Sequence, residues 1–363
     1  MMDLTQAIEL CTFCPRLCSD RCPVSLVEAR ETVTPQAKMA WLGLLRQQVP
    51  EAPGAPPRST LPVYACTGCG ACTQACLHRV EPGVHLLAGR ALAEEQQAGH
   101  PALADLPRRQ RARGRAAAAE VAGAVPEQRR RPDAPVAYLP PCLAQGGPGE
   151  DARRMLQLAD RAPGLSGEAP MSIAATDSSC AGYPLLAGGF VEDFRLYAED
   201  FARQVAGHAT LVVGCPACAW LLRTQYPLHG VPVRPHVLHL AEWLGRHAEA
   251  LPETPPLGRT AYHDPCYLGR GLGVYEEPRA VLGRATAALC EFARNRQEAT
   301  CAGGGALLPL TAPETARAIA EERLRELPPG VETVVTACPS CQRQLAGVAG
   351  APRVLGLLEV FQE

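Results

Sequence analysis

The sequence of 363 residues contains a single lysine, Lys38, against 34 arginines. We interpret this imbalance as a consequence of genomic base composition. The formal net charge is only −2, so no overall electrostatic field recruits nucleic acid or an anionic membrane. The length indicates about two or three domains, and the apolar fraction of 47% is sufficient for a substantial core.

Long apolar runs are also missing, so neither a secretory signal nor a transmembrane helix is expected. The first ten residues carry Asp3 and Glu9 and lack the basic start of a signal peptide. The longest uncharged apolar stretches, such as 209–222, fall short of about 18 residues and contain a Gly-Cys-Pro break. We therefore expect a cytoplasmic protein that reaches the inner face of the membrane only through a partner.

Cysteine, by contrast, is abundant, with 17 residues in the chain. The cytoplasm is a reducing compartment in which disulfides are rare. The clustered thiols therefore predict metal ligands, and a secreted disulfide scaffold is the alternative. Spacing leaves Cys290 alone and sorts the others into four groups. The groups are Cys11, Cys14, Cys18 and Cys22; Cys66, Cys69, Cys72 and Cys76; Cys142, Cys180, Cys215 and Cys218; and Cys266, Cys301, Cys338 and Cys341.

The first two groups indicate a two-cluster ferredoxin. Residues 66–76 have the spacing C-x2-C-x2-C-x3-C, in which three thiolates bind one [4Fe–4S] cube and the fourth binds its neighbour. Residues 11–22 have one extra residue in the second gap and are followed by Pro23. The predicted ligands are Cys11, Cys14, Cys18 and Cys76 for cluster 1, and Cys66, Cys69, Cys72 and Cys22 for cluster 2. A pair of zinc sites is the alternative, but zinc motifs usually pair two C-x2-C knuckles.

The last two groups form an internal repeat. Corresponding cysteines are offset by 121 to 124 residues, and such a nearly fixed offset indicates duplicated supersecondary units. Each copy has a β-branched run before a closing C-P-x-C pair, and its apolar pattern favours strands alternating with helices. One such helix is expected to begin near Thr311, with Pro313 and Glu314 in its first turn. Loops at the strand ends should converge on one metal in each copy. We call the predicted site of Cys142, Cys180, Cys215 and Cys218 site 3, and that of Cys266, Cys301, Cys338 and Cys341 site 4.

The predicted fold class is therefore α/β overall, with an N-terminal α-helical ferredoxin domain and two tandem, duplicated α/β cysteine-rich domains. We place the ferredoxin domain at 1–105, an Arg/Ala-rich linker at 106–133, and the cysteine-rich copies at 134–256 and 257–363. The linker contains eight arginines. A nucleic-acid tail is the alternative, but no aromatic residues are interleaved, which favours a solvated linker or a partner-docking strand.

This arrangement resembles the iron–sulfur proteins that join a helical two-cluster ferredoxin domain to two cysteine-rich "CCG" domains. That family includes heterodisulfide reductase subunits, the glycolate oxidase iron–sulfur subunit and the anaerobic glycerol-3-phosphate dehydrogenase small subunit. The most specific stretches are Tyr-His-Asp-Pro-Cys-Tyr-Leu-Gly-Arg at 262–270 and Cys-Ala-Gly-Gly-Gly at 301–305. The family has a second cysteine where this chain has Ala181 and Ala302.

In the heterodisulfide reductases, the paired cysteine belongs to a five-thiolate noncubane cluster that cleaves disulfides. The resemblance therefore implies a closed four-thiolate site in each copy here, either [4Fe–4S] or zinc. Glycines beside the cysteines either let backbone N–H groups approach sulfur or only form turns. His263 and Asp264 either adjust charge or carry a proton at site 4, or make ordinary strand-end hydrogen bonds, which we favour. Cys290 is expected to be a buried, inert thiol rather than a fifth ligand.

Together these features predict an iron–sulfur electron-transfer subunit of a multi-subunit oxidoreductase, itself non-catalytic. A nicotinamide loop is absent, since Val274 stands where G-x-G-x-x-G needs its third glycine. The resemblance implies electron relay between a flavoprotein dehydrogenase or another oxidoreductase subunit and a quinone, a membrane-bound subunit or another carrier, and no nucleic-acid partner. The alternatives are a heterodisulfide-type disulfide reductase and a partly zinc-bound interaction scaffold.

Overall fold

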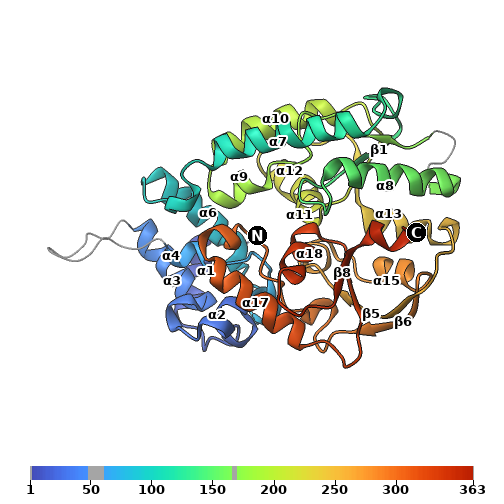
Figure 1. Ribbon diagram of the computed structural model, residues 1–363. Helices are drawn as coiled ribbons and strands as arrows, with labels where there is room; N and C mark the ends of the chain where they lie inside the picture. The colour runs from blue at the N-terminus through green and yellow to red at the C-terminus, as the bar shows by residue number, and fades with distance from the viewer. Residues whose placement is uncertain (1, 48–60, 166–169, 363) are drawn as a thin grey trace.

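The computed structural model describes residues 2–47, 61–165 and 170–362, and it has three parts (Figure 1). A helical N-terminal part precedes two α/β units, each built on a four-stranded parallel sheet. This arrangement confirms the predicted fold class. The domain boundaries proposed from the sequence remain predictions.

Capping side chains and prolines begin several helices of the N-terminal part. Thr34 accepts a hydrogen bond from the backbone N–H of Ala37, and Pro35 follows it as the first residue of α3. The helices are α1 (Leu4–Thr12), α2 (Pro23–Glu28), α3 (Pro35–Arg46), α4 (Leu61–Tyr64), α5 (Ala71–Ala75) and α6 (Pro82–Glu95). Short 3₁₀ turns are η1 (Ser19–Arg21), η2 (Glu31–Val33) and η3 (Pro101–Leu103).

The prediction of a solvated linker or docking strand at 106–133 was wrong, because most of this segment is helical. Helix α7 (Leu106–Ala124) spans 19 residues and is followed by η4 (Glu127–Arg129). Alanine and arginine are strong helix formers, so the segment needs few buried side chains to hold its conformation. Every third or fourth residue of α7 is buried, and this face packs on α8 (Pro148–Arg161) and α9 (Tyr183–Gly188).

The two sheets share one topology, β2-β1-β3-β4 in copy 1 and β6-β5-β7-β8 in copy 2. The strands are β1 (Val136–Leu139), β2 (Ser172–Ile173), β3 (Thr210–Val213), β4 (His236–His239), β5 (Leu257–His263), β6 (Thr286–Glu291), β7 (Thr333–Thr336) and β8 (Arg353–Gly356). The last residues of the central strands are in register, Leu139 with Val213 and His263 with Thr336. Because the strands are parallel, the loops that follow them leave each sheet side by side.

Helices alternate with these strands, as the sequence predicts. Copy 1 also has η5 (Pro163–Leu165), α10 (Val191–Val205), α11 (Pro216–Trp220), the π-helical turn η6 (Leu221–Gln225), α12 (Tyr226–Leu228), α13 (Leu240–Arg246) and η7 (Ala248–Ala250). Copy 2 has α14 (Gly269–Leu272), α15 (Glu277–Leu282), η8 (Arg296–Glu298), α16 (Leu308–Thr311), α17 (Pro313–Arg325), α18 (Pro339–Ala346) and η9 (Leu357–Phe361).

The expected helix near Thr311 exists, but its predicted cap is wrong. Thr311 ends α16, and its hydroxyl bonds back to the carbonyl of Leu307. Helix α17 starts at Pro313 after Ala312, which has no side-chain acceptor to offer. Proline, whose fixed φ suits a first turn, is therefore the local start signal here.

Apolar residues of the N-terminal part pack with both copies. Val24 and Val33 share a buried cluster with Leu308 and Ile319 of copy 2. A second cluster, around Leu86, includes residues of both copies at its edge. The ferredoxin-like part is therefore held against both cysteine-rich units, which positions its thiols near theirs.

Candidate metal centres

All 17 cysteines are free thiols, as expected for metal ligands rather than a disulfide scaffold. The predicted ligands of cluster 2 line one small cavity. Its lining includes Cys22, Cys66, Cys69 and Cys72, together with Lys38. Within the described ranges, no three metal-binding side chains converge as a single ion requires. A space walled by four thiols suits a polynuclear cluster with sulfur ligands better than one ion.

Local backbone structure places the cluster 2 thiols. Cys22 is the N-cap of α2, Cys72 lies in α5, and Cys66 and Cys69 lie in the turn before α5. In that turn Gly68 adopts φ +67° and its N–H donates to the Cys66 sulfur at 3.3 Å. Burial raises the pKa of Cys66, while the nearby charges of Lys38 and Arg90 act in the opposite direction.

The predicted ligands of cluster 1 are more exposed. Cys11, Cys14, Cys18 and Cys76 are all partly accessible to solvent. Burial raises the pKa of Cys11 to about 12, and Cys18, Cys76 and Cys14 add to the effect because their thiolates repel its charge. Cys76, which is 65 residues away from Cys11 in the chain, thus lies near the first run. This proximity supports the exchange of fourth ligands between the two runs, which remains a prediction.

Site 3 gathers its four predicted thiols through hydrogen bonds. Cys142 and Cys218 donate to the sulfur of Cys180, which raises their pKa values well above the usual range, with burial adding to the effect. Cys180 accepts from both, and from the N–H of Gly182 at 3.4 Å, so its pKa falls well below the usual range. The neighbouring Cys218 also lowers the pKa of Cys215. Cys142 and Cys215 follow the ends of β1 and β3, as predicted from the repeat.

Site 4 repeats this arrangement in copy 2. The Cys301 thiol donates to Cys266 and its pKa rises to about 12. The pKa of Cys341 lies well above its usual range, since its thiol bonds to Cys338 and is buried, and the charges of Cys266 and Cys301 add to this. The N–H of Gly303 donates to the Cys301 sulfur at 3.3 Å. Gly68, Gly182 and Gly303 therefore present N–H groups to sulfur. At these three positions the glycines do more than form turns, which was the alternative that the sequence left open.

One contact joins the ferredoxin-like part directly to site 4. The thiols of Cys69 and Cys301 lie close enough to shift each other's pKa, and this interaction contributes to the raised pKa of Cys69. Arg270 lies beside this contact and donates from Nε to the Cys69 carbonyl at 2.7 Å and from Nη1 to the carbonyl of Ala299 at 2.7 Å. Predicted cluster 2 and site 4 are therefore neighbours, although their thiols are far apart in the sequence.

His263 and Asp264 make structural bonds, as we favoured. His263 Nδ1 accepts from Arg323 at 3.0 Å, and Asp264 pairs with Arg279 at 2.8 and 2.9 Å. Cys290 lies on the outer strand β6 and is partly rather than fully buried.

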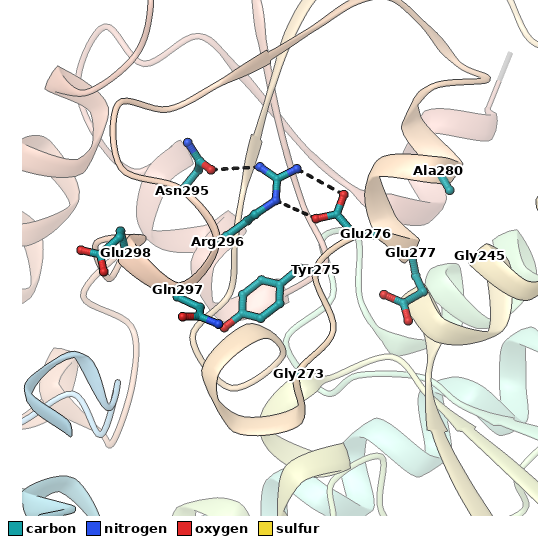
Figure 2. A pocket seen from close by; sticks show the side chains of 10 residues that line it. All are labelled: Gly245, Gly273, Tyr275, Glu276, Glu277, Ala280, Asn295, Arg296, Gln297 and Glu298. Atoms are coloured by element: carbon teal, nitrogen blue, oxygen red, sulfur yellow. Dashed lines mark hydrogen bonds and ion pairs between the residues drawn. The ribbon is translucent and has the colours of Figure 1, made fainter. Parts of the chain in front are cut away.

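A wide pocket between the two copies lies apart from the thiols, and no cysteine lines it among the residues that the structure describes. Figure 2 shows Arg296 in this pocket between Asn295 and Glu276, to which it bonds at 3.0 and 2.6 Å. The charged side chains of this pocket thus largely pair with one another, and the pocket is not part of the candidate metal centres.

Sequence reasoning missed three cations near predicted cluster 2, which are the buried Lys38 and Arg90 and the partly buried Arg270. The sequence gives one indication for Lys38, because the only lysine of the chain lies in the first turn of a helix whose start is predicted by Thr34 and Pro35. It gives no indication for Arg90 and Arg270, because their hydrogen-bond partners come from distant segments.

Comparison with known families gives two matches. A 4Fe-4S dicluster domain matches residues 7–80, and a cysteine-rich domain matches residues 136–223 and 260–346. The two cysteine-rich matches cover the first three strands of each sheet almost completely and end before β4 and β8, and the dicluster match covers the N-terminal thiols.

Several curated proteins are similar to this chain. A subunit of the fumarate reductase (CoM/CoB) of Methanothermobacter marburgensis is 26% identical over 309 residues, covering 82% of this chain and 61% of that protein. A subunit of the dihydromethanophenazine:CoB–CoM heterodisulfide reductase of Methanosarcina acetivorans is 30% identical, covering 47% and 44%. EtfAB:quinone oxidoreductase of Syntrophomonas wolfei is 34% identical, covering 40% and 22%. The chain thus spans about three fifths or less of the length of these relatives. None of the helices in the described ranges combines the length and apolar character needed to span a bilayer.

Proposed function

This chain belongs to the family of iron–sulfur proteins that join a 4Fe-4S dicluster domain to two CCG cysteine-rich domains, and we propose that it is an electron-transfer subunit of a multi-subunit oxidoreductase. A flavoprotein dehydrogenase or another oxidoreductase subunit donates the electrons, and a quinone or another carrier accepts them. The name of the Syntrophomonas relative supports a quinone acceptor. We place the protein in the cytoplasm, where a partner subunit provides any attachment to the membrane.

The contact between Cys69 and Cys301 carries this proposal. Each thiol belongs to a different four-cysteine set, and the two lie close enough to shift each other's pKa. Two metal groups held by these sets would be separated by little more than their own ligands. Such proximity has no use in a purely structural metal site, but it is what a relay of single electrons requires.

The chain's residues prepare these sites in two ways. Cysteine thiolates supply the ligands, and glycine N–H groups donate to the sulfurs of Cys66, Cys180 and Cys301. Such bonds stabilise added negative charge, so they raise the reduction potential. A bound [4Fe–4S] cluster supplies reversible one-electron storage at each site.

We propose four-thiolate [4Fe–4S] clusters at sites 3 and 4 as well, with zinc as the alternative there. Ala181 and Ala302 are fully buried where the family has a further cysteine, so neither site gains a fifth thiol from that position. Alanine at these two positions argues against a disulfide reductase, because the disulfide-cleaving members of the family use the thiol of the second cysteine.

Metal analysis of anaerobically purified protein tests the proposal. Four cubane clusters predict about 16 iron atoms per chain and a matching amount of acid-labile sulfide. Two clusters with two zinc ions predict about 8 iron and about 2 zinc, which would restrict electron relay to the ferredoxin-like part. Clusters that dithionite reduces, in a chain that does not oxidise hydroxy acids alone, are the expected result. Robust turnover by the isolated chain, or protein with zinc in all sites, would refute it.

A further inference from the structure

Lys38, the only lysine of the chain, is buried beside predicted cluster 2. The Thr34 cap and Pro35 start α3 so that Lys38 lies within its first turn and points inward. Its exposed fraction is 1%, and its Nζ lies 3.7 Å from the Cys22 sulfur. In a chain that otherwise uses arginine, a compact ammonium group thus occupies the wall of the four-thiol cavity.

The ammonium has no carboxylate to neutralise it. Among the ion pairs of the described residues, none includes Lys38, and its hydrogen bond goes to the Cys22 sulfur. Glu28 is close enough to feel its charge, but that carboxylate bonds to Arg30 and to the Thr315 hydroxyl. A buried charge is costly unless it is paired. Four thiolates around an iron–sulfur core carry net negative charge and so supply the missing counter-charge.

Two further cations, the fully buried Arg90 and the partly buried Arg270, lie beside the same thiols. Arg90 is fully buried and donates from Nη2 to the Cys66 carbonyl at 3.1 Å. Arg270 donates to the Cys69 carbonyl, and its Nη2 is buried without a partner. The cluster 1 thiols differ, because the charges acting on Cys11 and Cys18 are those of other cysteines.

We propose that Lys38, with Arg90 and Arg270 in support, raises the reduction potential of cluster 2 above that of cluster 1. This inference rests on the proposed function. Reduction adds one negative charge, and a buried cation stabilises the reduced form by direct attraction. In the loaded chain, one electron would pass from the reduced cluster held by the cluster 1 thiols to the oxidised cluster held by the cluster 2 thiols, with no change of bond or proton. The partly exposed cluster 1 thiols would lie on the side where electrons enter, and the more buried cluster 2 thiols would hold the accepting cluster beside Cys301.

Redox titration of the full, iron-loaded chain, monitored by EPR, tests this assignment. Lys38→Gln removes the charge, Lys38→Arg keeps it, and Arg46→Gln removes an exposed charge from the same helix as a matched control. Perturbation of one signal by Cys14→Ser identifies cluster 1. We expect Lys38→Gln to lower the ratio of reduced to oxidised cluster 2 at a fixed potential by at least about tenfold, equivalent to about 59 mV for one electron. Lys38→Arg should recover most of this shift, while Arg46→Gln and the cluster 1 midpoint should not change.

Each outcome has a distinct meaning. Full iron content with an unchanged cluster 2 midpoint in Lys38→Gln overturns the inference alone, as does a Lys38→Arg midpoint as low as that of Lys38→Gln. Wild-type chain that binds no iron–sulfur cluster overturns the proposed function and the inference with it. Lys38→Met provides a second neutral variant of similar length. If both neutral variants lose cluster 2 and Lys38→Arg retains it, the requirement for positive charge is supported.

Discussion

Replacing Arg90 should open the junction between the three parts of the molecule. Its guanidinium donates to the carbonyls of Val63, Tyr64 and Cys66 in the N-terminal part, at 3.0 to 3.2 Å. It also donates to the carbonyls of Ala187 in copy 1 and Ala306 in copy 2, at 2.8 and 2.7 Å. An arginine has five N–H donors, so one fully buried side chain satisfies five backbone acceptors from three parts of the fold.

The size of the effect follows from these contacts. Arg90→Met removes the donor from the carbonyls of Val63, Cys66, Ala187 and Ala306, while that of Tyr64 keeps the Thr311 hydroxyl at 3.5 Å, and each unsatisfied group costs about 1–3 kcal/mol. The effects are not additive, and relief from burying the guanidinium charge offsets part of them. Breaking a buried charged network by removing one partner costs about 3–5 kcal/mol, and we expect a value in that range for Arg90→Met. Arg90→Lys keeps the charge and three of the five donors, so it should cost less.

Hydrogen–deuterium exchange measures this opening directly, because it reports local opening without requiring reversible unfolding of the whole chain. Amides at 183–190 and 303–308 should exchange about two to three orders of magnitude faster in Arg90→Met, at about 1.4 kcal/mol per tenfold change. Arg195→Gln removes a 57% exposed side chain paired with Glu199 and should change little. Equal exchange in Arg90→Met and this control would refute the reasoning.

Three further predictions concern single sites. Cys341→Ser should lose the metal of site 4 while Cys290→Ser keeps full metal content, which iron and zinc analysis of both variants will show. Gly303→Ala should abolish site 4, since an added Cβ would lie 2.3 Å from a backbone oxygen at φ +86°, whereas Gly230→Ala at φ +74° meets open space and should retain full iron content. Burial raises the pKa of Asp151 to about 7, against a hydrogen bond from Tyr138. The native state therefore binds the extra proton, so the free energy of unfolding should fall by up to about 1.4 kcal/mol per pH unit as pH rises from 5.5 to 7, and Asp151→Asn should remove this slope in denaturant titrations.

Cysteine spacing made the grouping of the thiols predictable because each group is either local or fixed by a repeated strand. The runs at 11–22 and 66–76 each bring three predicted ligands together within a few turns of chain. In the repeats, Cys142 and Cys215 come close because they follow neighbouring parallel strands. The offset of 121 to 124 residues predicts the same arrangement in the second copy. Thiol groups that are fixed by local spacing or by a repeat can be predicted from the sequence alone.

Features that depend on the packing of distant segments were not predictable. Helix α7 was missed because its arginines suggested solvent, whereas Leu106, Ala117 and Val121 supply a buried face at helical spacing. The role of Lys38 was also missed, because the composition suggested only that lysine is rare through codon bias. Only the fold shows that this residue lies against Cys22 and that Arg270 reaches across to the Cys69 turn.

The duplicated sites are therefore not equivalent, although their spacings match. Site 4 touches the ferredoxin-like part through Cys301, while site 3 lies on the other side of an aromatic contact. Tyr267 directly follows Cys266, and Trp220 comes two residues after Cys218. Their ring centroids are 5.0 Å apart, so this pair joins the loops that carry the two sites. Gene duplication supplied two similar four-thiol frames, and packing against the N-terminal part made the second one the inner neighbour of cluster 2.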